Sequence, residues 1–225
     1  MTHLMRVNAP KSWPIERKTK KFVAKPAPGP HRLKECMPLG VILRELLKIS
    51  SKKRDIKIIL NNKNVLVNNK VRKEVRFPVG ILDTLSLPDL NKFYRIVYNK
   101  KGKLNLIEVP KEETLQKTLK ITNKTMLTKG KLQLNLYDGE NLIIDKNNCK
   151  VGDSVVIKDN KILKYLKFEK DAIVYLTGGK HIGTKGIVLE IKKTQGRGKN
   201  ILVYKIDNDV HETLADYAYV IEKWM

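Results

Sequence analysis

The chain has 225 residues with 46 Lys or Arg against 23 Asp or Glu, which gives a formal net charge of +23 at pH 7. Such an excess indicates a polyanionic partner, with nucleic acid favoured and an anionic membrane surface as the main alternative. No apolar run approaches the roughly 20 residues of a membrane-spanning helix, and the basic amino terminus lacks the apolar block of a signal peptide, so we expect a cytoplasmic protein without a membrane partner.

The positive charge is spread along the whole chain instead of being confined to one recognition element. A DNA-reading factor concentrates its charge on one element, whereas a protein embedded in folded RNA carries charge in every module. The length exceeds a typical single core and predicts two or three small modules. We expect an RNA-binding protein of the mostly β, α+β class.

Residues 1–36 form a predicted basic, extended segment. It is rich in Pro and Lys and has neither helical nor strand periodicity, so we expect it to stay mobile until a polyanion holds it. Trp13 has no periodic apolar neighbours, and we expect it to be exposed in the free protein and to stack on RNA bases. The predicted RNA contacts in this segment are Lys11, Trp13, Arg17, Lys18, Lys20, Lys21, Lys25, His31 and Arg32.

Two short helices open the predicted module at 37–92. Apolar residues recur at three- and four-residue steps over 37–49, and a second helix is expected over 50–63, capped by Ser50 or Ser51. Lys52, Lys53, Arg54 and Lys57 crowd the first half of that second helix. Cations there oppose the helix macrodipole, which favours a role in binding a ligand over the alternative of an ordinary solvated face.

A hairpin follows the helices. Val65 and Val67 alternate with polar residues before a turn at Asn68 and Asn69, and a basic, solvent-facing side is expected beyond the turn. Two helices followed by a Val-x-Val-Asn-x-Lys-Val hairpin resemble the S4-type RNA-binding domain. The resemblance implies that one basic concave surface contacts phosphates. Its candidate residues are Arg44, Lys48, Lys52, Lys53, Arg54, Lys57, Arg72, Lys73 and Arg76.

Residues 93–168 form a predicted β-rich module with one helical stretch at 111–120. Tyr94 and Tyr98 lie in a strand pattern and are expected in the core. The acidic residues Asp138 and Asp153 stand at turns, where Asp is preferred for backbone hydrogen bonding, so no metal site is predicted.

The last predicted module spans 169–225 and contains a glycine-rich loop at 178–186. Gly178 and Gly183 have Walker A spacing, but Thr184-Lys185 reverses the required order and the loop joins two predicted strands, so no nucleotide is expected. The loop resembles a KOW motif, an SH3-like barrel that binds RNA. Candidate contacts are Lys180 and Lys185, with Lys192, Lys193, Arg197 and Lys199 on a second loop that is either a basic finger or a solvated hairpin tip.

Cys36 and Cys149 are far apart and belong to no Cys-x-x-Cys pair. Two reduced, partly buried thiols are expected, without a zinc site, a disulfide or any cofactor.

The order of these parts resembles the archaeal and eukaryotic small-subunit ribosomal protein family S4e. The strings that carry the resemblance include HLMRVNAPKSWPI, PAPGPHRLKECMPLGVILR, VLVNNKVRKEVRFPVGILDTLSL, QLNLYDGENLI, KVGDSVVI and TGGKHIGTKGIV. The resemblance implies a structural, non-enzymatic constituent of the small ribosomal subunit that supports assembly and translation. Its implied partners are small-subunit rRNA and neighbouring small-subunit proteins, and a homo-oligomer is not expected.

Two alternatives belong to other functional classes. S4-type domains also accompany RNA-modifying enzymes, but these need a catalytic domain of roughly 200 residues, for which the chain has no room. A KOW-bearing transcription or translation factor, which binds transiently, is the second alternative.

Overall fold

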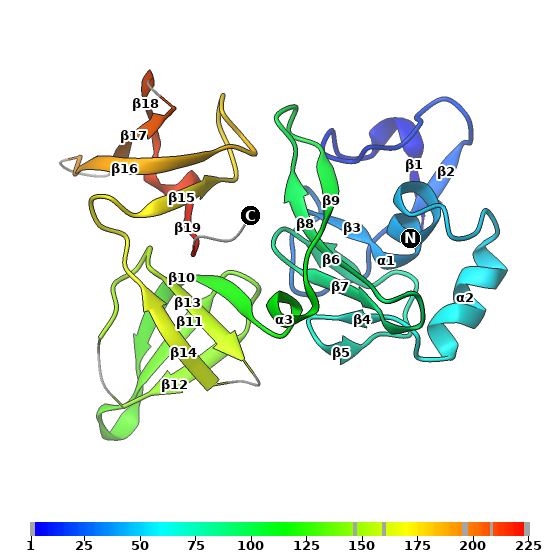
Figure 1. Cartoon of the computed structure of the whole chain (residues 1–225), viewed down its shortest axis with the longest axis horizontal. Coiled ribbons are helices and arrows are strands. Elements are labelled where there is room, and N and C mark those ends of the chain that lie inside the picture. Colours follow the sequence, from blue (N-terminus) through cyan, green and yellow to red (C-terminus); the bar gives the residue numbers. More distant parts are fainter. Residues whose placement is uncertain (1–2, 146–147, 159–160, 195–197, 208, 223–225) are drawn as a thin grey trace. The chain divides into compact units, whose positions relative to one another are not determined.

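The computed structural model describes residues 3–145, 148–158, 161–194, 198–207 and 209–222. The chain divides into two compact units, Met1–Lys117 and Thr118–Met225 (Figure 1). Both are built mainly from antiparallel strands with a few short helices, which confirms the expected mostly β class. Within the described ranges, no helix is both long and apolar enough to span a bilayer.

The first unit contains nine strands and several short helices in its described part. Its strands are β1 (His3–Met5), β2 (Phe22–Ala24), β3 (Cys36–Pro38), β4 (Leu66–Val67), β5 (Lys70–Val71), β6 (Pro78–Gly80), β7 (Thr84–Leu87), β8 (Lys92–Tyr98) and β9 (Leu104–Glu108). Its helical segments are η1 (Arg6–Asn8), α1 (Leu39–Val41), η2 (Ile42–Leu46), α2 (Lys53–Asn61), η3 (Pro88–Leu90) and α3 (Lys111–Thr114).

The largest sheet of this unit has the strand order β5-β4-β7-β8-β9. The β4–β5 connection is the predicted two-residue turn, in which Asn68 and Asn69 have φ values of 50° and 63°. Asn tolerates this left-handed conformation, which a type I′ hairpin turn requires at both central positions. Tyr94 and Tyr98 of β8 are buried, so their predicted core position is confirmed.

The amino-terminal segment is packed into the first unit, and the expectation that it stays mobile is wrong. β1 pairs with β2, with Leu4 opposite Val23. Trp13 is only 1% exposed, and its indole N–H donates a 2.7 Å hydrogen bond to the carbonyl of Cys36. The peptide N–H of Leu104 donates to the carbonyl of Ser12 at 2.8 Å. These partners are distant in sequence, so local periodicity did not reveal them.

A buried ion pair also anchors this segment. The Arg6 side chain is 2% exposed and its guanidinium lies 3.1 Å from Glu45 Oε1, while its Nε donates to the carbonyl of Glu16 at 2.7 Å. A buried guanidinium is costly unless it is paired and hydrogen bonded, and both conditions are met here.

The two predicted helices are present with shifted starts. The first is helical from Leu39 to Leu46, and Pro38 is its extended N-cap residue. α2 begins after Lys52, which provides no side-chain cap, so the predicted Ser cap is wrong. Instead the Ser50 hydroxyl accepts from the N–H of Lys52 at 3.2 Å and donates to Asp55 at 2.8 Å.

The second unit contains two five-stranded antiparallel sheets in its described part. The first has the order β12-β11-β10-β13-β14 and the second the order β18-β17-β16-β15-β19. The strands of the first sheet are β10 (Lys117–Met126), β11 (Leu132–Leu136), β12 (Asn141–Ile144), β13 (Ser154–Lys158) and β14 (Lys161–Leu166), with η4 (Thr128–Gly130) between β10 and β11. The second sheet has β15 (Ile173–Leu176), β16 (Lys185–Lys192), β17 (Ile201–Ile206), β18 (Asp209–Leu214) and β19 (Ala218–Val220), with η5 (Ala215–Tyr217) before β19.

The helix expected over 111–120 is only four residues long. α3 ends at Thr114, and β10 begins at Lys117. Leu119 and Ile121, two residues apart, are both buried in the core beneath the sheet. A two-residue apolar period is the strand period, and tertiary packing therefore overrides the helical tendency of this stretch.

Each sheet of the second unit covers its own apolar cluster, one around Ile121, Leu134 and Val155 and the other around Val174, Val188 and Leu202. Tyr219 of β19 links them, because its hydroxyl accepts from the N–H of Lys120 at 2.7 Å and donates to the carbonyl of Thr118 at 3.1 Å.

Candidate nucleic-acid interface

The predicted RNA contacts differ widely in exposure. Those with exposed side chains are Lys11, Lys18, Lys20, Lys21, Lys25, Arg32, Lys48, Lys52, Lys53, Arg54, Lys57, Lys73, Lys180, Lys185, Lys192, Lys193 and Lys199. Arg17, Arg44, Arg72 and Arg76 are half-buried. Arg197 lies outside the described residues.

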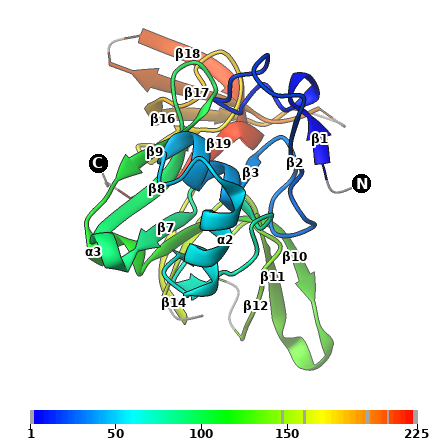
Figure 2. The same ribbon diagram turned by 90° about the vertical axis from the view of Figure 1, so that its right-hand side faces the viewer.

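Five of the exposed cations gather at α2. We call Lys48, Lys52, Lys53, Arg54 and Lys57 the α2 basic surface. The opposite side of the helix packs inward, with Ile56 and Leu60 almost fully buried. Figures 1 and 2 show α2 on the outside of the first unit. The helix therefore presents its cations to solvent, as the sequence predicted.

The ring of Trp13 is buried in the free protein, so it presents no face on which an RNA base could stack. Its burial and its hydrogen bond to Cys36 make it part of the core of the first unit, and the expectation of an exposed indole is wrong.

His31 is likewise a structural residue instead of an exposed RNA contact. Its imidazole is 2% exposed, and Nε2 lies 2.7 Å from Asp83 Oδ2. Asp83 also accepts hydrogen bonds from the N–H of Gly80 at 2.9 Å and from the Asn68 side chain at 2.7 Å. Burial alone would raise the pKa of Asp83, but the charge and hydrogen bond of His31, together with Lys117 and Asn68, lower it to about 2.

The half-buried arginines have protein partners. Arg44 lies 3.0 Å from Glu45, and Arg76 lies 3.6 Å from Glu74. The Arg72 guanidinium lies 4.3 Å from the centroid of the Phe77 ring, a cation–π arrangement. These contacts hold the guanidinium groups in place.

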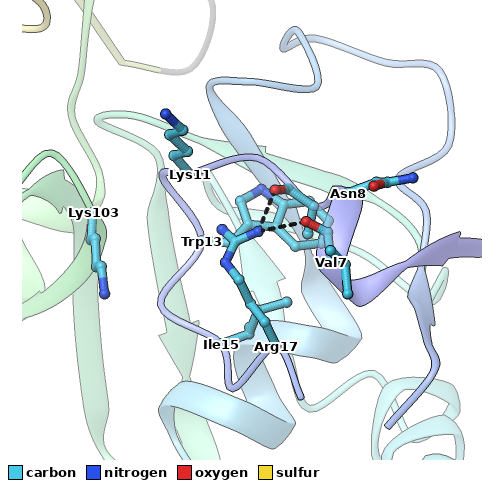
Figure 3. A pocket seen from close by; sticks show the side chains of 8 residues that line it. Val7, Asn8, Lys11, Trp13, Ile15, Arg17 and Lys103 are labelled. Atoms are coloured by element: carbon cyan, nitrogen blue, oxygen red, sulfur yellow. Dashed lines mark hydrogen bonds between the residues drawn. The ribbon is translucent and has the colours of Figure 1, made fainter. Parts of the chain in front are cut away.

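A pocket of about 440 Å³ opens in the amino-terminal segment (Figure 3). It is lined by Val7, Asn8, Ala9, Lys11, Trp13, Ile15, Arg17 and Lys103. The Arg17 guanidinium donates to the carbonyls of Val7 at 3.2 Å, Ala9 at 2.7 Å and Pro10 at 2.8 Å. Arg17 therefore fixes the loop that borders the pocket.

Lys103 and Asn8 are lining residues that the sequence analysis missed. Lys103 follows a turn at Gly102, whose φ is 69°, and leads into β9. The long-range hydrogen bond between Ser12 and Leu104 ties this turn to the amino-terminal segment, so no local pattern could have identified Lys103.

The glycine-rich loop of the second unit is tightly turned. Gly179 and Gly183 have φ values of 85° and 80°, which favour glycine. His181 in this loop stacks on His211 of β18, with ring centroids 4.2 Å apart. Burial, the neighbouring His211 and Lys180 all lower the pKa of His181. Lys180 and Lys185 lie on either side of His181 in sequence and are exposed.

Two lysines near the loop after β16 form ion pairs with carboxylates of the same chain. Lys192 lies 2.7 Å from Glu212, and Lys199 lies 2.8 Å from Asp216. A hydrogen bond and the charge of its partner raise the pKa of each lysine. An RNA phosphate would have to compete with these carboxylates.

The acidic turn residues serve the backbone, as predicted. Asp138 accepts from the N–H of Glu140 at 3.0 Å, and Asp153 accepts from the N–H groups of Lys150 at 2.6 Å and Phe168 at 2.8 Å. Among the described residues, no group of three or more His, Cys, Asp or Glu side chains could hold a metal ion.

The two cysteines are free and buried, more deeply than the partly buried thiols that the sequence predicts. Burial, with Asp83 and Glu35 nearby, raises the pKa of Cys36 to about 12. The thiol is therefore protonated and unreactive at neutral pH.

Comparisons with known proteins agree over nearly the whole chain. The ribosomal family S4e matches residues 90–162, and the RS4NT domain matches residues 2–34. Small ribosomal subunit protein eS4 of Methanocella arvoryzae is 44% identical over 98% of this chain and 94% of its own length. The eS4 protein of Methanosphaera stadtmanae is 42% identical over 97% of this chain and 91% of its own length.

A solved structure shows the same similarity. The crystal structure of 30S ribosomal protein S4e from Thermoplasma acidophilum superposes with a TM-score of 0.73 at 30% sequence identity, covering 83% of this chain and 95% of that one. The sequence strings, the packed amino-terminal segment and these full-length relatives lead to one conclusion: the chain belongs to the ribosomal S4e family.

Proposed function

We propose that this chain is a structural constituent of the small ribosomal subunit that holds rRNA by electrostatic contacts on both of its units. Membership of the S4e family makes it a non-enzymatic ribosomal protein, which removes the RNA-modifying enzyme as an alternative. The expected setting is the cytoplasmic ribosome, with rRNA and neighbouring small-subunit proteins as partners. Sequence-independent phosphate contacts account for the net charge of +23.

The observation that carries this proposal is the α2 basic surface. All five cations are exposed, and Lys53, Arg54 and Lys57 lie on α2, whose other side is buried. Lys53 and Lys57 are one helical turn apart and so share a side of the helix. Positive charge near a helix N-terminus is unfavourable for the isolated helix, and a phosphate backbone would compensate it.

Finer features of the proposal rest on the order of elements. α1 and η2, α2 and the β4–β5 hairpin follow in the order of an S4-type RNA-binding domain. The five-stranded sheet β18-β17-β16-β15-β19 and the glycine-rich loop before β16 support a KOW-type, SH3-like module. Lys180 and Lys185 would contact phosphates there, and the loop after β16 would act as a basic finger.

The salt dependence of rRNA binding tests the proposal. Four cations of the α2 basic surface, Lys52, Lys53, Arg54 and Lys57, are replaced by Gln. A control variant loses the same number of charges at the exposed residues Lys131, Lys158, Lys161 and Lys170, which the sequence analysis did not assign to RNA.

Each lost phosphate contact should reduce the slope of log K against log salt by about 0.9 for a duplex. We expect the slope of the α2 variant to fall by about 3 and the slope of the control to fall by less than about 1. Equal slopes for the two variants would show that binding depends on net charge alone and would contradict the assigned surface.

A further inference from the structure

We infer that the pocket lined by Val7, Lys11, Arg17 and Lys103 binds a single unpaired nucleotide of RNA. This inference rests on the proposed rRNA-binding function and adds a specific element to it, because general phosphate contacts do not require an unpaired base. The volume of about 440 Å³ suits one nucleotide, since small-molecule sites measure about 300–1,000 Å³.

The pocket offers an apolar surface to a base. Ala9, Trp13 and Ile15 line it and are at least nine-tenths buried, so their accessible atoms form its inner wall. Val7 also lines it and is 66% exposed, so its side chain adds accessible apolar surface to the pocket. The faces of nucleobases are apolar enough to cover such a surface.

Arg17 makes the pocket preformed. Its hydrogen bonds to the carbonyls of Val7 and Ala9 (Figure 3) and of Pro10 use both terminal nitrogens and fix the bordering loop. Both terminal nitrogens are committed to carbonyls, so Arg17 is poorly placed to form a bidentate phosphate contact. The guanidinium plane remains as a rigid cationic surface of the kind on which RNA bases stack.

The charge around the pocket fits an anionic occupant. Lys11 and Lys103 are exposed and stand on one side of the pocket in Figure 3, with Val7 and Asn8 on the other. None of the lining residues in the described chain is acidic. A phosphate would lie near the lysines while the Asn8 amide, which both donates and accepts hydrogen bonds, could read a base edge.

Only an unpaired nucleotide can use these features together. In an RNA helix the base faces are covered by stacking, and the major groove is too narrow for side chains to read. A bulged or loop nucleotide exposes its face and can enter a pocket while the adjoining backbone stays on the basic exterior.

The test compares two RNA hairpins that share one stem, of which one carries a single bulged 4-thiouridine and the other is fully paired. Their affinities for the full-length chain are measured at one salt concentration, and the photo-crosslinked peptide is mapped. We expect the bulged hairpin to bind about tenfold tighter, near the low end of the effect of stacking one base. The crosslink is expected at residues 7–17 or at Lys103, which line the pocket.

Matched variants locate the preference. Lys103→Ala removes a lining cation, whereas Lys101→Ala removes an exposed cation from the same turn outside the pocket. Val7→Glu places a negative charge at the pocket. Val71→Glu is its control and places the same charge at an exposed valine that does not line the pocket. Lys103→Ala and Val7→Glu should reduce the preference for the bulge several-fold, and the two controls should preserve it.

The outcomes separate the two proposals. Equal affinity for both hairpins, a crosslink outside residues 7–17 and Lys103, or a bulge preference that survives Val7→Glu would overturn the nucleotide pocket and leave rRNA binding standing. Failure to bind either hairpin, together with no binding to purified small-subunit rRNA, would overturn the proposed function itself.

Discussion

The indole N–H of Trp13 donates a 2.7 Å hydrogen bond to the backbone carbonyl of Cys36. Both residues are almost completely buried, so the bond joins the amino-terminal segment to β3 inside the first unit. A segment with the composition of a disordered tail is thus part of a folded core.

Replacing Trp13 should destabilise the first unit strongly. Trp13→Ala removes a large buried ring and leaves the Cys36 carbonyl without its donor, and we expect a loss of about 3–5 kcal/mol in the free energy of unfolding. Val7→Ala, at a residue 66% exposed, is the control and should cost less than about 0.5 kcal/mol. Urea unfolding of the free protein measures both; a similar loss for the two variants would contradict the burial of Trp13.

The Arg6–Glu45 pair should show energetic coupling. Glu45→Gln leaves the 2% exposed Arg6 guanidinium without its carboxylate, and Arg6→Met removes the buried charge. Most of the stability lost in Glu45→Gln comes from the unpaired Arg6 charge, which is absent from the double variant. The double variant should therefore lose less unfolding free energy than the two single losses added together, by at least about 1 kcal/mol. Additive effects in a double-mutant cycle would show that the two side chains do not interact.

Stability should fall in acid as Asp83 becomes protonated. Its pKa is lowered from 3.8 to about 2 in the folded protein, so between these values the unfolded chain binds more protons. The contribution, on the order of 2 kcal/mol, is present above about pH 4 and is lost as the pH falls towards 2.

Asp83→Asn tests this dependence. Unfolding free energies measured from pH 6 to pH 2 should show a stability gap between wild type and Asp83→Asn that narrows over the acidic part of the range. The exposed Asp89→Asn variant is the control and should follow the wild-type curve. A constant gap for Asp83→Asn would rule out a carboxylate held ionised by His31.

Tyr219→Phe should weaken the second unit. The substitution preserves the ring but removes the hydroxyl that pairs with the N–H of Lys120 and the carbonyl of Thr118. We expect a loss of about 1–3 kcal/mol, because two backbone groups lose a partner. Tyr217→Phe, at a ring 37% exposed, should have a smaller effect in the same thermal unfolding measurement. Equal losses would argue against a specific role of the Tyr219 hydroxyl.

Local sequence features predicted the elements that depend on local physics. The Asn68-Asn69 turn, the amphipathic helices and the alternating strands follow from backbone preference and periodicity over a few residues. The role of Asp153 was also predictable, because Asp at a turn usually bonds nearby N–H groups.

Contacts between distant segments left no local signal in the sequence. Trp13 and Cys36 are 23 positions apart, and Arg6 and Glu45 are 39 positions apart. The positive charge of Arg17 is visible in the sequence, while the carbonyls of Ala9 and Pro10 that accept its hydrogen bonds become close only in the fold. Lys103 was missed for the same reason, because the next residue, Leu104 of β9, bonds to Ser12 of the amino-terminal segment only in the folded chain.

The hydrogen bond from the N–H of Leu104 to the carbonyl of Ser12 sets an order of events during protein synthesis. Ser12 is translated long before Leu104, so the nascent amino-terminal stretch must wait for the β8–β9 hairpin before its packing is complete. The first unit therefore completes its fold only after Leu104 at the start of β9 has been synthesised.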